Sequence, residues 1–491
     1  MKAGVIGAGI GGLAIASLLA NDGYEVDIYE KNDTPGGKLN QVVSQGYQFD
    51  TGPSLLTMPY IIEQLFAICE KDVNDYLTIE PLDLLCRYFY PDGTIFNCYK
   101  DIDKTVNEIK KFAPEDSGHY APFLKYAENL YDRTSTSFLL NPLSKWSDFL
   151  GLSYLDILRI DSFHTVSERV EHFFESSYMR QFFKRFTTYN GSSPYKAPAT
   201  LNVIPHVELS MGGYYIRGGM YQLAQALHKL AIDSGVTFHF NTTVQSIEAV
   251  KDRKHHIITN RDSQNQYDLV VSNSDATETY LKLLNRPKLS AKKRNKIQRQ
   301  EPSCSGFVLL LGCNKEFSQL EHHNIFFSPD YENEFHQIFD KQTAAENPTI
   351  YVTNTSLKDS ELSPKNHSNL FVLVNAPYLS DKISWSDYKE EYASKIINIL
   401  EDRGLNNLRQ SIEIKEIITP EDFYNKYLSN RGSIYGTSSN SKWAAFNRPK
   451  NKSPYIKNLY LVGGSTHPGG GIPLVILSAF HAWRLINRDH R

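Results

Sequence analysis

The chain has 491 residues, of which 41% are hydrophobic and 22% are charged, and its formal net charge is −3. This composition is ordinary for a globular protein of two or three domains, and the small net charge gives no basis for a nucleic-acid partner. The five cysteines form no CxxC pair and the histidines show no ligand-like spacing, so we expect reduced core thiols and no metal site. No uncharged apolar run reaches the roughly 18 residues that a membrane span needs.

The N-terminal residues predict a βαβ unit. Residues 3–6 form a short apolar run, and residues 7–12 are rich in glycine. Residues 13–19 continue with small and apolar side chains that suit a helix, and residues 25–30 form a second strand-like run. Because this unit begins almost at the first residue, we expect no cleavable leader before it. The order of strand, tight turn, helix and strand is typical of a dinucleotide-binding domain.

The turn of this unit carries the motif GxGxxG at Gly7, Gly9 and Gly12. The first glycine permits the tight turn, the second lets the backbone approach a pyrophosphate, and the third lets the helix pack against the strand. The helix N-terminus presents free N–H groups to the phosphates. Glu30, at the end of the second strand, can accept hydrogen bonds from the ribose hydroxyls of an adenosine.

The rest of the chain alternates between helical and strand-like segments. From about residue 100 to 190, apolar and aromatic residues recur at helical spacing, and the α/β pattern returns near residue 215. Helices are expected at 221–234, 386–402 and 473–487, and strands at 236–240, 244–249, 255–259, 269–271, 307–311, 350–353, 370–374 and 458–462.

Two further glycine-rich elements favour FAD over NAD as the cofactor. Gly36-Gly37-Lys38 follows the second strand and suits a loop that closes over the same pyrophosphate, which an NAD domain does not need. Near the C-terminus, residues 463–472 form a glycine-rich turn before a final helix, whose N-terminus would stabilise the negative charge of a reduced flavin. His467 lies in this turn, and both a catalytic role and a structural or flavin-packing role are open for it.

The combination of these motifs with residues 49–54 and 216–220 resembles the bacterial phytoene-desaturase-type carotenoid desaturases and oxidases, and the resemblance spans the whole chain. Residues 57–60, 189–193 and 430–436 look closest to two subgroups of that family. One subgroup contains the 3,4-desaturases of 1-hydroxylated acyclic carotenoids. The other contains the terminal-methyl oxidases of diapocarotenoids.

The resemblance implies an α/β protein with amine-oxidase-like flavoprotein architecture, in which a Rossmann-type FAD-binding domain is joined to a substrate domain of sheet and helices. The expected FAD-binding domain consists of residues 1–85, 215–290 and 455–491, with a helical, membrane-facing lid at 86–214 and the substrate domain at 291–454. The implied FAD-binding residues are Gly7, Gly9, Ile10, Gly12, Glu30, Lys38, Ser54, Leu55, Val244, Asn273, Gly464, Gly471 and Ile472.

One of these residues departs from the family pattern. Lys38 stands where the family usually has arginine. Lysine keeps the positive charge but loses the bidentate fork of a guanidinium group. We therefore expect phosphate binding to survive at this position.

The activity that the resemblance implies is FAD-dependent removal of two hydrogens from an acyclic carotenoid, with 3,4-desaturation of a 1-hydroxylated end as the first choice. The flavin accepts the hydride, so no catalytic acid or base is assigned on the protein. Phytoene- or diapophytoene-type desaturation, terminal-methyl oxidation and flavin-dependent isomerisation stay open. A flavin amine oxidase is the alternative from another class. The electron acceptor, either oxygen or a quinone, is left open.

A carotenoid substrate dissolves in membranes, so we expect a cytoplasmic protein attached peripherally to the inner face of the cell membrane. The interfacial surface is predicted around residues 138–143 and at Trp146, Phe149, Leu150, Leu152, Tyr154, Leu155 and Leu158. The alternative is that these side chains cover the core of the substrate domain.

Overall fold

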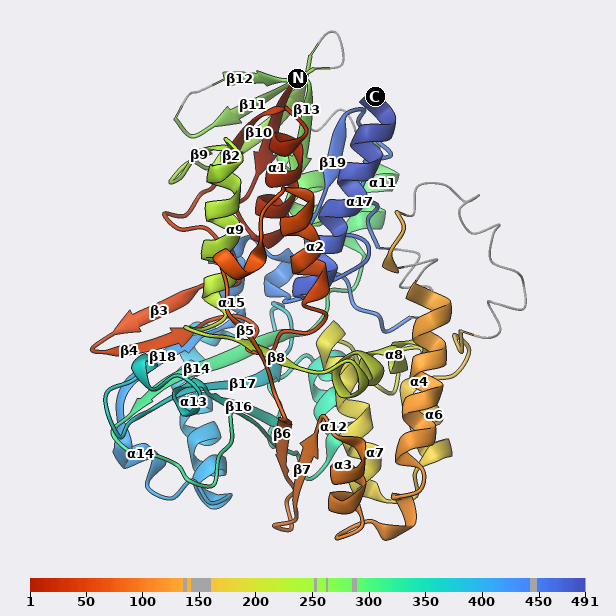
Figure 1. Ribbon diagram of the computed structural model, residues 1–491, viewed down its shortest axis with the longest axis vertical. Helices are drawn as coiled ribbons and strands as arrows, with labels where there is room; N and C mark the ends of the chain where they lie inside the picture. Colours follow the sequence, from red (N-terminus) through yellow and green to blue (C-terminus); the bar gives the residue numbers. More distant parts are fainter. Residues whose placement is uncertain are drawn as a thin grey trace.

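The computed structural model describes residues 1–135, 139–142, 160–250, 254–261, 264–284, 289–441 and 448–490. The molecule has two parts that are stacked along its long axis (Figure 1). The upper part in this view contains both termini and a parallel sheet, and the lower part contains a larger sheet flanked by helices.

The upper part is built on a five-stranded parallel sheet with the order β19-β13-β1-β2-β9. Its strands are β1 (Lys2–Ile6), β2 (Glu25–Tyr29), β9 (Thr237–His239), β13 (Leu269–Ser272) and β19 (Leu459–Leu461). The strands predicted at these five places are confirmed. The central strands are apolar and buried because both faces of the sheet are covered. Segments from the beginning, middle and end of the chain therefore form one sheet.

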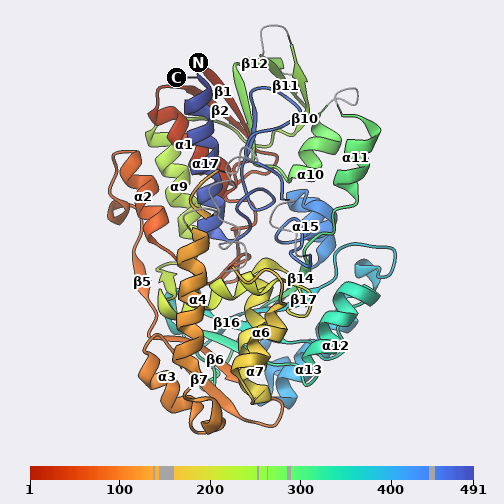
Figure 2. The same cartoon turned by 90° about the vertical axis from the view of Figure 1, so that its right-hand side faces the viewer.

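Helices cover one face of this sheet and a small antiparallel sheet covers the other. Helices α1 (Ile10–Asn21), α9 (Tyr221–Asp233) and α17 (Ile472–His490) run side by side, with α2 (Tyr60–Ile68) packed on α17 (Figure 2). The small sheet contains β10 (Val244–Ala249), β11 (His255–Thr259) and β12 (Gln264–Tyr267). Gly4 permits its close approach, because a Cβ at Gly4 would lie 2.5 Å from the Cδ1 atom of Ile257. Both faces of the sheet in the upper part are thus covered.

The lower part is built on a seven-stranded sheet with the order β18-β14-β17-β16-β15-β6-β7. Its strands are β6 (Leu84–Phe89), β7 (Ile95–Tyr99), β14 (Ser305–Cys313), β15 (His323–Phe326), β16 (Ile350–Asn354), β17 (Ser368–Ala376) and β18 (Ile412–Ile418). The strands expected within 307–374 are confirmed. Every residue of β14 is buried, since α13 (Trp385–Asp402) covers part of the sheet.

The hairpin of β6 and β7 lies across one of the domain boundaries that the sequence analysis predicted. The boundary predicted between residues 85 and 86 falls inside β6, and this strand pairs in parallel with β15, more than two hundred residues later in the sequence. The sequence analysis predicted no strand at 84–99, and the pairing of β6 with β15 is set by tertiary packing. The division into three segments stays a prediction.

The helical part that was expected near residues 100–190 is confirmed for the residues that the structure describes. Its helices are α3 (Ile102–Ile109), α4 (Tyr120–Thr134), α6 (Val166–Phe173) and α7 (Ser177–Lys184). They enclose an aromatic core in which the ring centroids of Phe123 and Phe183 lie 4.2 Å apart. Two short strands, β5 (Ile79–Pro81) and β8 (Tyr214–Ile216), pair where the chain leaves the upper part and returns to it.

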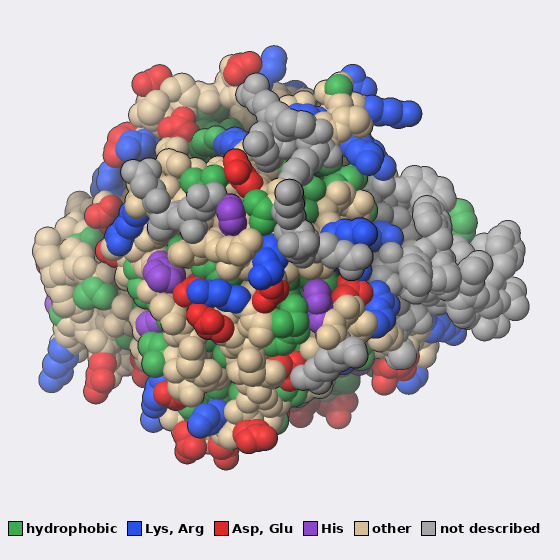
Figure 3. All heavy atoms as spheres, turned by 90° about the horizontal axis from the view of Figure 1, so that it is seen from above, with side chains coloured by type: hydrophobic (Ala, Val, Ile, Leu, Met, Phe, Trp, Pro, Cys, Tyr) green, Lys and Arg blue, Asp and Glu red, His purple; other side chains and the backbone are tan. Residues whose placement is uncertain are grey.

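Surface and core properties agree with the composition. The five cysteines are buried and form no disulfide, as expected. On the end of the molecule that carries the termini, Lys and Arg side chains are interspersed with Asp and Glu (Figure 3). Among the described residues, no helix combines the length and the apolar character that crossing a membrane requires.

Asp50 connects two of the sequence motifs. It ends the hairpin of β3 (Gln41–Ser44) and β4 (Tyr47–Asp50), and its carboxylate accepts hydrogen bonds from the backbone N–H groups of Met220 (2.8 Å) and Tyr221 (2.9 Å) at the start of α9. The residue is only 8% exposed, and burial raises the pKa of its carboxyl to about 6. The motifs at 49–54 and 216–220 therefore meet at a buried helix cap.

Replacement of this cap is predicted to destabilise the protein. Asp50→Ala leaves two buried N–H groups at the start of α9 without their acceptor, and each such loss costs about 1–3 kcal/mol. The free energy of unfolding, measured by urea denaturation, should fall by about 2–6 kcal/mol. The exposed Asp381 supplies the control, since Asp381→Ala should leave this value unchanged. Equal stability of the two variants would show that Asp50 is not a structural cap.

Candidate functional site

A cavity of about 460 Å³ lies between the two sheets. One end is formed by the loops that follow the carboxyl ends of β1, β2, β13 and β19, and the other end is formed by the face of the seven-stranded sheet and the segment after α7. Ligands of open parallel sheets bind at the carboxyl ends of the strands, and this volume is in the range of small-molecule sites. The cavity is therefore the candidate functional site.

The first turn is shaped by its glycines. Gly7 has a φ of +92°, which favours glycine. A Cβ at Gly12 would lie 2.0 Å from the carbonyl oxygen of Gly7, so only glycine lets α1 begin this close to β1. Gly7, Gly9 and Ile10 line the cavity, whereas Gly12 lies behind them and does not. The turn thus presents backbone and the N-terminus of α1 to the cavity.

Asn273 follows β13 and fills the space that the glycines leave. A Cβ at Gly9 would lie 2.7 Å from its Nδ2 atom, and a Cβ at Gly463 would lie 2.7 Å from its Oδ1 atom. Its backbone N–H donates to the carbonyl of Ile6 at 2.8 Å. One amide side chain therefore packs between the first turn and the C-terminal turn.

Glu30 follows β2, is 6% exposed and lines the cavity. Its Oε2 atom accepts the N–H of Ala8 at 2.8 Å, and its Oε1 atom accepts the N–H of Asn32 at 2.9 Å. Burial raises its pKa, and these two hydrogen bonds oppose the rise. Each carboxylate oxygen can accept a second hydrogen bond, so the ribose hydroxyls expected here would still find an acceptor.

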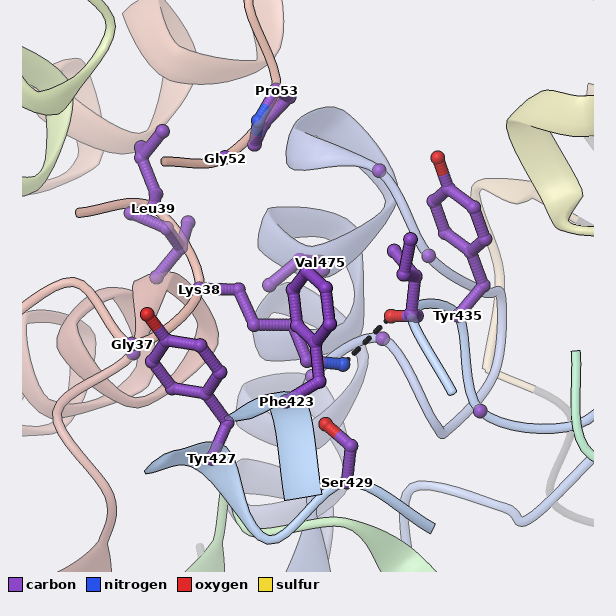
Figure 4. A pocket seen from close by; sticks show the side chains of 18 of the residues that line it. Gly37, Lys38, Leu39, Gly52, Pro53, Phe423, Tyr427, Ser429, Tyr435 and Val475 are labelled. Atoms are coloured by element: carbon purple, nitrogen blue, oxygen red, sulfur yellow. Dashed lines mark hydrogen bonds between the residues drawn. The ribbon is translucent and has the colours of Figure 1, made fainter. Parts of the chain in front are cut away.

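Lys38 spans the cavity from the Gly36-Gly37 loop to the segment after α15 (Pro420–Tyr427). Its Nζ atom donates to the carbonyl oxygens of Ser433 (3.1 Å) and Ile434 (2.7 Å), the second of which is drawn as a dashed line in Figure 4. Burial lowers its pKa to about 8. The ammonium group has three donors, so one remains for an anion.

Arg448, which the sequence analysis did not single out, contacts the C-terminal turn through hydrogen bonds. Its guanidinium donates to the carbonyls of Gly464 (2.9 Å), Thr437 (3.0 Å) and Tyr435 (3.2 Å) and to the side chain of Asn190 (3.2 Å). Burial lowers its pKa to about 10, which still leaves it charged at neutral pH. This arginine therefore fixes three cavity-lining segments relative to one another.

His467 does not line the cavity. It is 1% exposed, and its ring stacks on that of His481 with the ring centroids 5.3 Å apart. Its Nε2 atom lies 3.2 Å from the carbonyl oxygen of Asn141. Of the two roles that the sequence left open, the geometry favours the structural one.

The remaining predicted residues also converge on the cavity. Ser54 and Leu55 enter from the 49–54 turn, and the Ser54 hydroxyl lies 2.6 Å from that of Tyr351 on β16. Val244 opens β10. The predicted residues that line the cavity are Gly7, Gly9, Ile10, Glu30, Lys38, Ser54, Leu55, Val244, Asn273, Gly464, Gly471 and Ile472. The structure thus brings together every predicted residue except Gly12; their contacts with FAD stay a prediction.

The far end of the cavity carries Arg185 and Tyr331, two polar residues that the sequence analysis missed. Arg185 comes from the segment after α7, together with Tyr189 of the motif at 189–193, and Tyr331 comes from α12 (Tyr331–His336). Arg185 lies four residues before that motif, and this closeness was the one available sequence signal. The residues that surround Arg185 in space come from distant parts of the chain, and no local sequence pattern predicts that they lie together.

Comparison with known proteins places the chain in a family. The model of the flavin-containing amine oxidoreductases matches residues 10–487, and the chain belongs to that family. The 4,4'-diaponeurosporene oxygenase of Staphylococcus haemolyticus is 37% identical and covers 96% of this chain and 94% of its own length. An enzyme of the same name from Staphylococcus aureus is 37% identical over 96% of this chain and 95% of its own length. The protein is thus a flavin-dependent oxidoreductase with FAD as its cofactor, and the resemblance to the bacterial carotenoid desaturases and oxidases is confirmed.

Solved structures confirm the expected fold class. A cyclohexylamine oxidase from Brevibacterium oxydans superimposes with a TM-score of 0.64 and 13% identity, covering 100% of this chain and 99% of its own. An oxidoreductase from Methanosarcina mazei gives a TM-score of 0.65 and 17% identity, covering 99% and 100% of the two chains. At these identities the likeness concerns the α/β flavoprotein fold alone.

The close approach at Gly12 gives a test of the first turn. Gly12→Ala places a Cβ against the Gly7 carbonyl, so the turn must open and FAD occupancy of the purified protein should fall at least about tenfold. The ratio of flavin absorbance to protein absorbance measures this occupancy. Gly118→Ala is the control, because a Cβ there meets open space. Full occupancy in both variants would contradict the role of Gly12.

Lys38 is predicted to make FAD affinity depend on pH. A bound phosphate would stabilise the charged form and raise the pKa of Lys38 above its value of about 8, so binding takes up a proton above that pH. The Kd for FAD, measured by fluorescence titration, should rise by up to about tenfold per pH unit above pH 8. Lys38→Arg should keep the affinity and remove this dependence, because arginine stays charged. The same pH dependence in both proteins would assign it to another group.

Proposed function

We propose that this protein oxidises the terminal methyl group of an acyclic carotenoid with FAD as the electron acceptor. The observation that carries the proposal is the similarity, at 37% identity and over 96% of the chain, to enzymes named 4,4'-diaponeurosporene oxygenase. The cavity beside the glycine-rich strand ends, with apolar side chains between its two polar ends, supports it.

The residues at the strand ends fit FAD. The first turn offers unencumbered backbone and the N-terminus of α1 to a pyrophosphate, and Lys38 adds a half-buried positive charge. Glu30 retains acceptor positions for a ribose, and the start of α17 at Ile472 offers positive dipole potential to the flavin ring. We assign FAD binding to the residues that the sequence predicted, with Gly12 acting through packing.

The opposite wall suits an elongated hydrocarbon. Phe371, Leu373 and Asn375 alternate along β17 and therefore face the same side of the sheet, towards the cavity. Val308 on β14 pairs with Leu373 and lines the cavity beside it. This face can align a polyene against the flavin while it excludes water.

When bound, FAD would supply the acceptor for a hydride from the reacting carbon. Water supplies the oxygen atom in the first two-electron oxidation, from methyl to alcohol, and a proton is released to solvent. The second oxidation, from alcohol to aldehyde, removes two further hydrogens and requires that the final acceptor first reoxidise the flavin. The protein supplies position and a dry environment. Of the lining carboxylates Glu30 and Asp275, both accept backbone N–H groups, so neither is assigned as a catalytic base.

The wall between the two ends of the cavity favours a neutral, lipophilic substrate over an amine. Val308, Phe371 and Leu373 line it, and their side chains offer an ammonium group neither a negative charge nor a hydrogen-bond acceptor.

Desaturation at the 3,4 position is the second candidate, because the polar groups around Arg185 would also receive the hydroxyl of a 1-hydroxylated end. It yields a product two hydrogens lighter, whereas terminal oxidation adds oxygen.

A lipophilic substrate implies exchange with a membrane, and we propose peripheral attachment to its cytoplasmic face. Most of the predicted interfacial surface (138 and 143–158) lies outside the described residues. The described residues 139–142 lie against α17, where the carbonyl of Leu139 is 2.9 Å from the Nε2 atom of His481 and that of Leu140 accepts from Arg484 at 2.7 Å.

Oxygen or a quinone is the proposed final acceptor of the electrons from the reduced flavin.

The proposal is tested by pigment analysis in a carotenoid-producing bacterial host. Separate strains supply a diapocarotenoid, phytoene, lycopene and a 1-hydroxylated acyclic carotenoid. We expect the diapocarotenoid to gain oxygen at a terminal carbon, as measured by mass spectrometry of the extracted pigment. The Gly12→Ala variant serves as a control for flavin dependence. A product two hydrogens lighter and formed only from the hydroxylated carotenoid would instead establish the 3,4-desaturase, and conversion of phytoene alone would establish a general desaturase.

A further inference from the structure

We infer that the far end of the cavity binds the oxygen atom of an oxygenated carotenoid terminus, an alcohol or an aldehyde, through Arg185 and Tyr331. This inference rests on the proposed function and extends it, because it names the groups that would distinguish an oxygenated end from a hydrocarbon end.

The first observation is a buried cation in an apolar enclosure. Arg185 is 5% exposed, and its guanidinium carbon lies 3.9 Å from the ring centroid of Phe186 and 5.3 Å from that of Tyr88. Burying an unpaired charge is energetically unfavourable, so a buried arginine is expected to have an oppositely charged or hydrogen-bonding partner. Its Nη2 atom donates to the Oε1 atom of Glu208 and to the hydroxyl of Tyr88, both at 2.5 Å.

The second observation is that this pairing is incomplete. The Nε–H group of Arg185 is buried and has no hydrogen-bond partner in the protein. The hydroxyl of Tyr331 and the Oε1 atom of Glu334, both on α12, are also buried without a partner. Buried polar atoms in folded proteins are almost always paired. Arg185 and Tyr331 line the cavity, so a ligand in the cavity can complete their hydrogen bonds.

These groups belong to one end of the cavity. Arg185 and Tyr331 both line it, and Thr349, which also lines it, donates to the Oε2 atom of Glu334 at 2.7 Å. The charges of Arg185 and Glu334 both act on the pKa of Tyr331, which burial raises well above its ordinary value. The phenol therefore stays protonated and can donate to a ligand oxygen or accept from a ligand hydroxyl.

The local charge favours a neutral oxygen over a carboxylate. Glu208 already neutralises Arg185, and Tyr189 donates to the second oxygen of Glu208. Glu334 adds a second acidic group, whose pKa burial raises to about 7. A carboxylate ligand would meet two glutamates and no uncompensated positive charge. An aldehyde or alcohol oxygen needs only an N–H or O–H donor, and Arg185 and Tyr331 supply these.

The inference is tested by ligand affinity, which is independent of turnover. The FAD-loaded protein is titrated in detergent micelles with an acyclic polyene aldehyde, the polyene hydrocarbon of equal length and the corresponding acid, and binding is followed by quenching of flavin fluorescence. In the wild type we expect the aldehyde to bind at least about tenfold more tightly than the hydrocarbon, as one hydrogen bond to a charged donor allows. The acid should bind no better than the hydrocarbon.

Two variants remove the donors. Tyr331→Phe deletes one hydroxyl, and the double change Arg185→Met with Glu208→Gln removes both members of the ion pair, so that no buried charge is left alone. In each variant the preference for the aldehyde should fall severalfold, while the Kd of the hydrocarbon stays unchanged. Tyr280→Phe is the matched control, since Tyr280 is a buried tyrosine that does not line the cavity, and it should retain the wild-type preference.

The outcomes separate the inference from the proposed function. An unchanged preference in both variants, or tightest binding of the acid, would overturn the assignment of a neutral oxygen to Arg185 and Tyr331. Oxygenated pigments from a wild type that shows no preference would overturn it as well. A preference that disappears in the variants would support it even if pigment analysis revealed desaturation, and only the proposed function would then fail.

Discussion

The candidate functional site depends on the close approach of the ends of β1 and β13 to the start of α1, where the backbone leaves no room for side chains. A Cβ at Gly12 would lie 2.0 Å from the Gly7 carbonyl, and one at Gly9 would lie 2.7 Å from the amide of Asn273. These distances are shorter than any van der Waals contact, so the start of α1 and the ends of β1 and β13 can come together only around glycine. The result is a surface of bare backbone beside a helix N-terminus, which is what a pyrophosphate requires.

From this surface the cavity extends to a second sheet, and the character of its lining changes on the way. The strand ends offer backbone and the charged groups Glu30 and Lys38, the face of β17 offers Phe371 and Leu373, and the far end offers Arg185 in an aromatic enclosure. Proteins of the same fold act on amines, as the name of the cyclohexylamine oxidase states. The fold therefore does not decide the substrate, and we propose that the residues that line the cavity do.

The cofactor half of the site could be predicted from the sequence because its signals are local. Gly7, Gly9 and Glu30 lie within one βαβ unit, where strand, turn and helix have distinct patterns. The hydrogen bond between Asp50 and Met220 joins the motifs at 49–54 and 216–220. The sequence analysis named both motifs as part of the family resemblance but predicted no contact between them. Such a contact requires the tertiary structure.

The substrate half could not be predicted in this way. Arg185, Tyr331 and Tyr351 come from three distant segments, and each one alone is an unremarkable polar or aromatic residue. The pairing of β6 with β15 escaped prediction for the same reason, since a parallel partner more than two hundred residues away leaves no mark in the local pattern. Helices and strands, by contrast, were expected close to where they occur, as α9, α13 and α17 show.

Reduction of the flavin under anaerobic conditions tests the central claim, that FAD and an acyclic carotenoid share this cavity, most directly. The FAD-loaded protein is mixed without oxygen with a diapocarotenoid in liposomes, and in parallel with primary amines, and the absorption band of oxidised flavin is followed. The account predicts that the carotenoid bleaches this band and that the amines leave it unchanged. Bleaching by an amine, with none by any acyclic carotenoid, would contradict it.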